Sequence, residues 1–174
     1  MIYKFAHFEV DVDVERTRAF YQAARVMTDD CSCSGCRNFV KAMNFLPEKV
    51  TTFFTRLGVD MKKLTEIWVN CTNADGTISY NGLSNVCGKL IAGENAWVTC
   101  WEEKDPRKPY GVTKYWEEEN TYSITNDFRI SFQEDCSLVD IDFPRPVIQL
   151  DLSADIPWVL DEVNDYPIDT TRRR

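Results

Sequence analysis

The sequence contains a single histidine, His7, and only seven glycines among its 174 residues. The glycines are scattered, and none belongs to a phosphate-binding loop. His7 has no serine or cysteine close to it in the sequence, so a histidine-activated nucleophile would have to assemble across the fold. No sequence motif therefore identifies a reaction.

Long apolar runs are absent as well, since no stretch approaches the roughly 20 residues that a membrane-spanning helix needs. The first residues lack the charged region, the apolar run and the small-residue cleavage site of a secretory signal peptide. We therefore expect no membrane partner and a cytoplasmic location.

Positive charge is scarce relative to negative charge, with 20 Lys and Arg against 28 Asp and Glu and a net charge of −8. An acidic surface repels the phosphates of nucleic acids and of anionic lipids, so we expect no nucleic-acid partner. The same charge would attract a basic protein partner. Apolar residues make up 44% of the chain, which is enough for one sizeable hydrophobic core.

The beginning of the chain has the alternating pattern of a half-buried strand. Apolar and acidic residues alternate strictly over 8–14, so that each kind occupies its own face. The apolar residues before this strand have the opposite parity, which predicts a bulge or tight turn near Ala6 and His7. Residues 15–25 are typical of a short helix.

A stronger helical pattern follows, in which apolar residues recur at alternating steps of four and three. These residues are Phe39, Met43, Leu46, Val50, Phe53 and Leu57. Pro47 interrupts the run, so either one helix kinks there or a second helix begins with Pro47 in its first turn. Gly58 suits a left-handed helix end, with Val59 folding back on the helix. We expect this apolar face to pack on a sheet.

The chain turns to β structure from Leu64 onward. Candidate strands cover 66–72, 77–80, 86–91, 96–101, 115–124, 128–133 and 148–153. Turn signals separate several of them, including the segment 73–76 and the pair Asn81-Gly82. Most of these strands follow one another without an intervening helix.

This order of elements predicts the fold class. Because helices and strands do not alternate, we expect an α+β fold: an antiparallel β-rich sheet or sandwich with one helical insertion at about 36–57. No linker or repeat divides the chain, so we expect a single domain over residues 1–162. The residues 163–174 are polar and are expected to form a loosely ordered tail.

The densest chemical feature is a group of three cysteines, Cys31, Cys33 and Cys36, just before the predicted helix. In a reducing compartment, cysteines persist as core thiols, metal ligands or redox groups rather than as disulfides. Zinc prefers thiolate ligands, and the Cys33-to-Cys36 spacing places two sulfurs in one turn. A fourth zinc ligand would have to come from a distant part of the sequence, and the candidates are Cys87 and Cys136.

Two other interpretations of the group stay open. Cys33 and Cys36 have the spacing of disulfide-exchange enzymes, and the thiolate of a cysteine at a helix N-terminus is stabilised. However, the pair does not follow a strand in a βαβ unit, as the thioredoxin arrangement requires. Alternatively, the three small side chains form a turn without chemistry, with Gly35 permitting a tight backbone. Cys71 and Cys100 lie in candidate strands and are interpreted as core residues.

Four segments of the chain resemble a group of small uncharacterised bacterial proteins of unknown function. These segments are Cys31–Phe39, Leu57–Asp60, Phe143–Pro146 and Ile156–Glu162. The resemblance runs from the N-terminal strand nearly to the tail. It implies a bacterial, cytoplasmic origin, and it brings no activity, substrate or catalytic residue with it.

These observations favour a non-enzymatic binding or interaction protein, in which the cysteine group holds a structural zinc ion or simply packs. The first alternative is a thiol-dependent redox enzyme that uses Cys33 and Cys36. The second is a hydrolase whose carboxylates converge only in the fold. A closed metal site would favour the binding protein, an exposed thiol of low pKa the redox enzyme, and a pocket with paired carboxylates the hydrolase.

Overall fold

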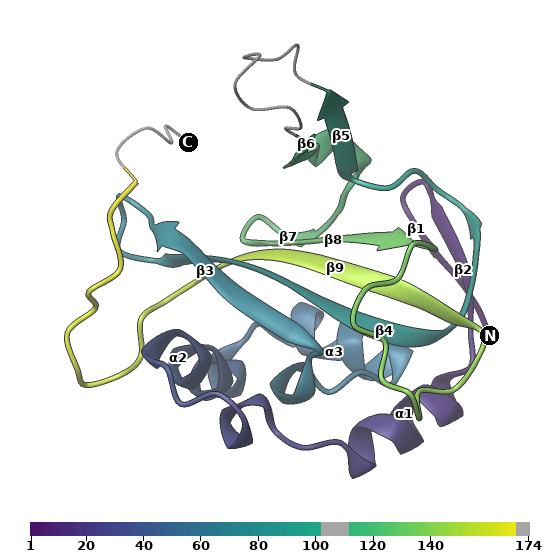
Figure 1. Cartoon of the computed structure of the whole chain (residues 1–174), viewed down its shortest axis with the longest axis horizontal. Helices are drawn as coiled ribbons and strands as arrows, with labels where there is room; N and C mark the ends of the chain where they lie inside the picture. Colours follow the sequence, from purple (N-terminus) through teal and green to yellow (C-terminus); the bar gives the residue numbers. More distant parts are fainter. Residues whose placement is uncertain (102–111, 170–174) are drawn as a thin grey trace.

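A computed structural model of the protein describes the backbone of residues 1–101 and 112–169 and the side chains of 1–98 and 116–169. The described part is built on a seven-stranded sheet whose strand pairings are all antiparallel (Figure 1). Six strands lie in the order β1-β2-β4-β9-β8-β7, and β3 pairs with the first half of β4. The strands are β1 Ile2–Phe5, β2 Phe8–Val12, β3 Glu66–Thr72, β4 Ile78–Ala92, β7 Tyr122–Thr125, β8 Phe128–Gln133 and β9 Val147–Ile156. The predicted α+β class with an antiparallel sheet is therefore confirmed.

Three α-helices cover one face of this sheet (Figure 1). They are α1 Val14–Ala23, α2 Ser34–Ala42 and α3 Glu48–Leu57, joined by short 3₁₀ turns. The predicted insertion at about 36–57 therefore consists of two helices, because Pro47 caps the start of α3 in an extended conformation. α3 ends at Gly58, whose φ of 80° is a left-handed conformation that glycine adopts without strain. The N–H of Val59 then folds back to donate to the carbonyl of Phe54 at 3.0 Å, as the sequence predicts.

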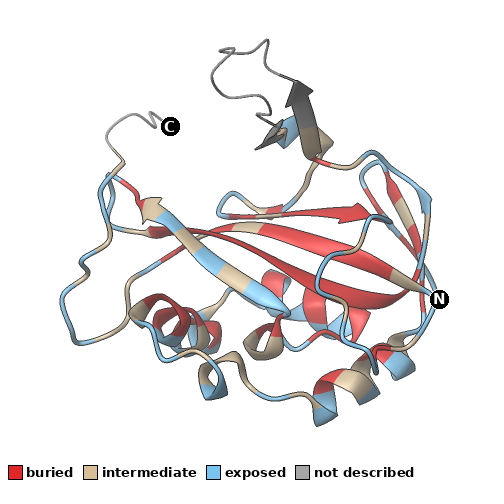
Figure 2. Cartoon of the chain, in the orientation of Figure 1, coloured by how far each residue is buried: buried red, intermediate tan, exposed pale blue. Residues whose placement is uncertain are grey.

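The hydrophobic core lies between the helices and the sheet, where the buried faces of both meet (Figure 2). Phe39 of α2 packs edge-on against Tyr80 of β4, with ring centroids 5.3 Å apart. Phe53 of α3 packs against Phe5 of β1, with ring centroids 4.8 Å apart. The expected burial of Phe53 is therefore confirmed, and the other members of the apolar stripe are buried too, except Leu46, which is half-buried against the core.

The strand β4 differs from its prediction. It runs without a break through Asn81-Gly82, so that pair is not a turn. β3 lies so close to β4 here that a Cβ on Gly82 would stand 2.7 Å from the carbonyl oxygen of Glu66. The glycine therefore permits two strands to approach each other, a role that a turn signal in the sequence does not reveal.

A second, two-stranded sheet stands away from the main sheet (Figure 1). It is formed by β5 Trp97–Trp101 and β6 Val112–Trp116. The rings of Trp97 and Trp116 meet edge to face with centroids 5.2 Å apart. The strand expected at 115–124 is divided by a 3₁₀ turn at Glu118–Asn120, so its two ends belong to β6 and β7.

The chain after β9 returns along α2 and β3; we call residues 157–169 the C-terminal segment (Figure 1). The N–H of Thr72, the last residue of β3, donates to the carbonyl of Pro167 at 2.8 Å. The N–H of Asp169 donates in turn to the carbonyl of Thr72 at 2.9 Å. Residues 163–169 thus hydrogen-bond to the body of the protein, whereas 170–174 lie outside the described residues. The expectation of a loosely ordered tail from 163 stays a prediction.

Candidate metal centre at the start of α2

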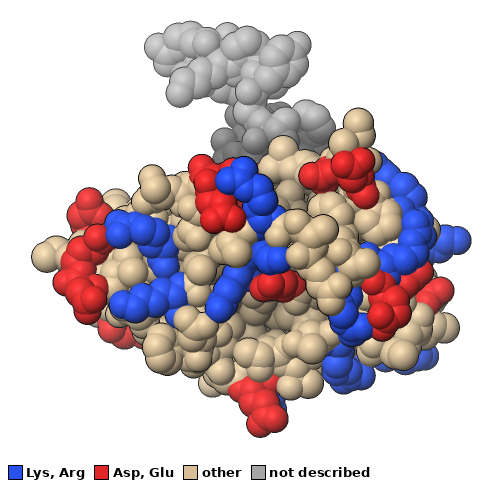
Figure 3. Space-filling model, turned by 90° about the horizontal axis from the view of Figure 1, so that it is seen from below, with Lys and Arg blue, Asp and Glu red and all other residues tan. Residues whose placement is uncertain are grey.

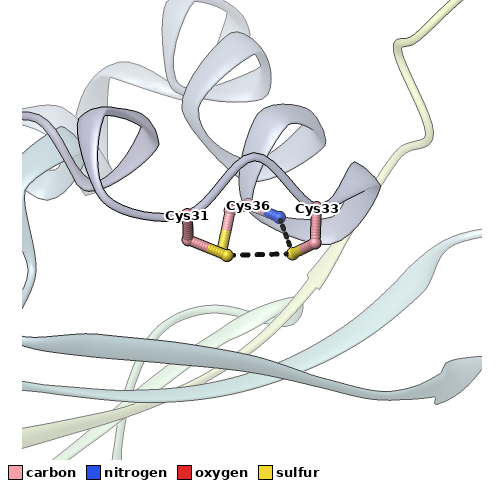
Figure 4. A group of neighbouring side chains, drawn as sticks. All are labelled: Cys31, Cys33 and Cys36. Carbon is pink, nitrogen blue, oxygen red and sulfur yellow. Dashed lines mark hydrogen bonds between the residues drawn. The ribbon is translucent and has the colours of Figure 1, made fainter.

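The structure brings the thiols of Cys31, Cys33 and Cys36 together at the start of α2 (Figure 4). Their three Sγ atoms all lie within 4.8 Å of one another. The sulfurs of Cys31 and Cys33 are 3.3 Å apart, and Cys33 Sγ accepts a hydrogen bond from the N–H of Cys36 at 3.4 Å. These residues therefore form a site that could hold a metal ion.

The local geometry follows from where each cysteine falls relative to the helix. Cys33 is the N-cap residue, so its extended backbone lets its sulfur turn back to the N–H of Cys36. Cys36 lies in the first helical turn and is buried, whereas Cys33 is exposed and Cys31 is half-buried. Gly35 is helical, and a Cβ there would stand 2.7 Å from both the Oη of Tyr166 and a methyl group of Val69. The absence of a side chain at this position therefore serves close packing, and not the tight backbone expected from the sequence.

The environment separates the pKa values of two of the thiols. A hydrogen bond from the backbone N–H of Cys33, together with bonds from the thiols of Cys36 and Cys33, holds the pKa of Cys31 below its ordinary value. Burial raises the pKa of the Cys36 thiol well above its ordinary value, and its bonds to Cys31 and Cys33 add to this. Metal ligands must be thiolates, so binding an ion here would release protons, and Cys36 gives up its proton less readily than Cys31.

The distances between the sulfurs fit a single ion. A tetrahedral zinc ion with Zn–S bonds of about 2.3 Å places its sulfur ligands roughly 3.8 Å from one another. The separation of 3.3 Å between Cys31 and Cys33 is shorter than this value, and the limit of 4.8 Å for the group is longer. The sulfur separations therefore bracket the value for one zinc ion, and rotation about the Cα–Cβ bonds is the side-chain motion that adjusts them.

The structure does not bring either expected fourth ligand to the group. Gly35 lies beside the cysteines, and its carbonyl accepts a hydrogen bond from Tyr80 of β4. Cys87 lies seven residues farther along that strand, which is about 23 Å at the usual rise of 3.3 Å per residue. Cys136 donates to the carbonyl of Val147, the residue paired with Cys87, so it lies at the same distant end. Among the described residues, no further His, Cys, Asp or Glu joins the three cysteines.

The C-terminal segment contacts the residues between and after the cysteines, which sequence reasoning missed. Tyr166 Oη accepts a hydrogen bond from the N–H of Gly35 at 3.1 Å. Arg37 forms an ion pair of 2.6 Å with Glu162, and the side chain of Asn38 accepts from the N–H of Val159 at 2.7 Å. No local sequence signal could have found these contacts, since Arg37 and Glu162 lie 125 residues apart in the chain.

The other candidate residues have structural roles. His7 lies exposed in the tight turn that was predicted between β1 and β2, where Ala6 has a φ of 52°. In the acidic row of β2, Asp11 pairs with the N-terminal ammonium at 2.9 Å. Asp13 caps the start of α1 by accepting from the N–H of Arg16 at 3.1 Å. Neither carboxylate therefore belongs to a convergent cation site.

The helix-covered face carries Lys and Arg side chains interspersed with Asp and Glu (Figure 3).

No helix in the part of the chain that the structure describes is long and apolar enough to cross a membrane. Comparison of the chain with protein-family models, with curated proteins and with solved structures found no match. The chemistry of the cysteine site therefore has to be inferred from its own geometry.

Proposed function

We propose that this protein is a non-enzymatic binding protein of the reducing cytoplasm in which Cys31, Cys33 and Cys36 hold one zinc ion. The observation that supports this function is the convergence of three Sγ atoms within 4.8 Å at the start of α2. Thiolates favour zinc over harder ions such as magnesium and calcium. Bound zinc would cross-link the loop before α2 to its first turn and thereby stabilise this end of the protein.

The site differs from a closed structural zinc site. Four protein ligands surround the ion in closed sites, whereas three converge in the described part of this chain. A fourth ligand from a binding partner would close the site, as the binding-protein interpretation requires, whereas water would leave it open. Because Cys33 is exposed, an exogenous ligand can approach from that side. The proposed zinc therefore exchanges faster with chelators than an ion enclosed by four thiolates.

The acidic loop between β8 and β9 supports a basic protein as the partner. Leu138 and Ile141 expose 62% and 93% of their surface there. The exposed acids beside them are Glu134, Asp135, Asp140 and Asp142. Apolar side chains in an acidic rim suit a partner with apolar contacts and positive charge around them.

At low salt, Asp140→Lys should weaken the binding of a small basic test protein in fluorescence anisotropy. The matched variant Asp127→Lys, in another exposed loop, should not; equal effects would contradict this surface.

Metal content tests the zinc site directly. Protein purified without chelator should contain about one zinc per chain by elemental analysis. Cys33→Ser should abolish this content and lower the melting temperature as much as a chelator does, because metal-binding free energy is folding free energy. Cys136→Ser, which changes a half-buried thiol outside the group, is the matched control and should keep the zinc. A zinc content well under one ion per chain, together with a melting temperature that does not change when a chelator is added, would refute the proposal.

A second candidate, thiol–disulfide exchange, is favoured by the 3.3 Å separation of the Cys31 and Cys33 sulfurs and by the lowered pKa of Cys31. In this reaction the Cys31 thiolate attacks a substrate disulfide and expels one thiolate. Cys33 then attacks the mixed disulfide, which releases the second thiolate and leaves a Cys31–Cys33 disulfide. The nucleophile would thus be Cys31, because the Cys36 thiol of the expected pair is buried with a raised pKa.

Alkylation separates the two candidates. Under the zinc proposal, all three thiols react slowly with iodoacetamide until a chelator is added, because they are metal-bound. Under the exchange reaction, Cys31 reacts quickly without chelator, and mild oxidation gives a disulfide that dithiothreitol reverses. Mass spectrometry of labelled peptides distinguishes these patterns.

A further inference from the structure

The C-terminal segment hydrogen-bonds to the backbone that separates the cysteines. Tyr166 Oη accepts from the N–H of Gly35 at 3.1 Å and lies 3.5 Å from the hydroxyl of Ser34. Ser34 and Gly35 are the two residues between Cys33 and Cys36. The phenol thus takes one of the orphan N–H groups of the first turn of α2, while Cys33 Sγ takes another.

Arg37 joins the cysteine loop to the same segment with a single guanidinium group. Its Nε donates to the carbonyl of Ser32 at 3.1 Å, and its terminal nitrogen pairs with Glu162 at 2.6 Å. Ser32 lies between Cys31 and Cys33. The loop conformation that brings the three sulfurs together is therefore the one that the guanidinium group of Arg37 links to Glu162.

Tyr166 is itself held on both sides. Its N–H donates to the side chain of Asn164 at 3.1 Å, and its carbonyl accepts from the hydroxyl of Thr72 at 3.0 Å. The ring of Trp158 packs against it with centroids 6.3 Å apart. The hydroxyl group of Tyr166 therefore contacts Gly35 from a segment whose backbone is itself docked on the protein.

From these contacts we propose that docking of the C-terminal segment and metal binding at the cysteine group stabilise each other, with Tyr166 and Glu162 as positioning residues. This inference rests on the proposed zinc site. Both events favour the same conformation of residues 31–37, so each lowers the free-energy cost of the other. Thermodynamic linkage makes the effect reciprocal. Loss of the ion destabilises the docked segment, and loss of the segment's contacts lowers the affinity of the cysteine group for the ion. Whether the segment is docked therefore depends on whether the site holds an ion.

Hydrogen exchange of the intact protein tests one direction of this coupling. Amides of residues 158–166 should exchange faster after zinc is removed by a chelator, because their docking loses the support of the metal-bound loop. Amides of β8, at Phe128–Gln133, serve as the internal control and should keep their protection.

Zinc affinity tests the other direction, by competition with a chromophoric chelator. Tyr166→Phe removes the acceptor of the Gly35 N–H but keeps the ring, and should weaken zinc binding about fivefold, as expected for one hydrogen bond. Tyr122→Phe, which removes a hydroxyl from a half-buried ring of β7, should leave the affinity unchanged. Glu162→Gln is a milder surface change that keeps the fold, and should weaken binding roughly twofold.

The outcomes separate the two proposals. If the unmodified protein binds no zinc, the zinc site and the coupling both fall. If it binds one zinc but Tyr166→Phe and Glu162→Gln bind as tightly as the unmodified protein, and chelation leaves the exchange of 158–166 unchanged, only the coupling falls. A role of Tyr166 in stability alone would lower the melting temperature without changing zinc affinity, and that result also overturns the coupling.

Discussion

Asn38 offers the sharpest test of how the C-terminal segment is attached. Its side chain is fully buried in α2 and makes three hydrogen bonds. The Nδ2 group donates to Tyr80 Oη and to the carbonyl of Pro157, each at 3.1 Å. Oδ1 accepts from the N–H of Val159 at 2.7 Å. One amide therefore ties α2 to β4 and to the segment that follows β9.

Asn38→Ala should destabilise the protein by about 3 kcal/mol, since each intramolecular hydrogen bond contributes about 1 kcal/mol net. The variant also leaves the N–H of Val159 and the carbonyl of Pro157 without their partner, which pushes the loss upward. A loss of this size corresponds to a fall in melting temperature of roughly 6–12 °C for a domain of this length.

Equilibrium unfolding in urea measures the loss as a shift in midpoint at constant slope. Asn44→Ala changes an exposed asparagine just beyond α2 and should cost under about 0.5 kcal/mol. In a double-mutant cycle with Tyr80→Phe, the coupling energy should be about 1 kcal/mol, because the two side chains share one hydrogen bond. A loss below roughly 1 kcal/mol for Asn38→Ala would show that the amide does not hold the segment in solution.

Three further predictions follow from the core and the helix ends. Phe53→Ala should cost about 3–5 kcal/mol in denaturant unfolding, because the ring is buried among other aromatic rings; a loss under about 1 kcal/mol would mean that this face is not packed. Gly58→Ala should cost at least about 1–2 kcal/mol, because φ is 80° and the added Cβ would stand 2.6 Å from the carbonyl oxygen of Val14; unchanged stability would contradict the left-handed helix end. Burial raises the pKa of Tyr21 from 10.0 to about 12. The folded state therefore keeps a proton that the unfolded state loses above pH 10, so stability falls between about pH 10 and 12 by up to roughly 2.7 kcal/mol. Tyr21→Phe should flatten this fall in urea titrations, and an equal slope in both proteins would argue against the raised pKa.

The sequence alone determined the features that depend on neighbouring residues. Pro47 separates two helices because its ring and missing N–H act on the adjoining turn, and Gly58 ends a helix because it tolerates a positive φ. The alternation of apolar and polar residues identified most of the strands, since side chains of a strand point alternately to its two faces. The cysteine group was visible because its three members lie within six residues, a spacing that one loop and one helical turn can close.

Only the tertiary structure decided what surrounds that group. Tyr166 reaches Gly35 across 131 residues of sequence, and this contact depends on the strand order that returns the chain beside α2 after β9. The same order leaves Cys87 at the far end of β4, although its residue type suited a fourth ligand. Asn81-Gly82 reads as a turn, yet pairing with strands on both sides holds it extended. Such contacts arise from the packing of whole elements, and a local pattern cannot encode them because the partner lies elsewhere in the chain.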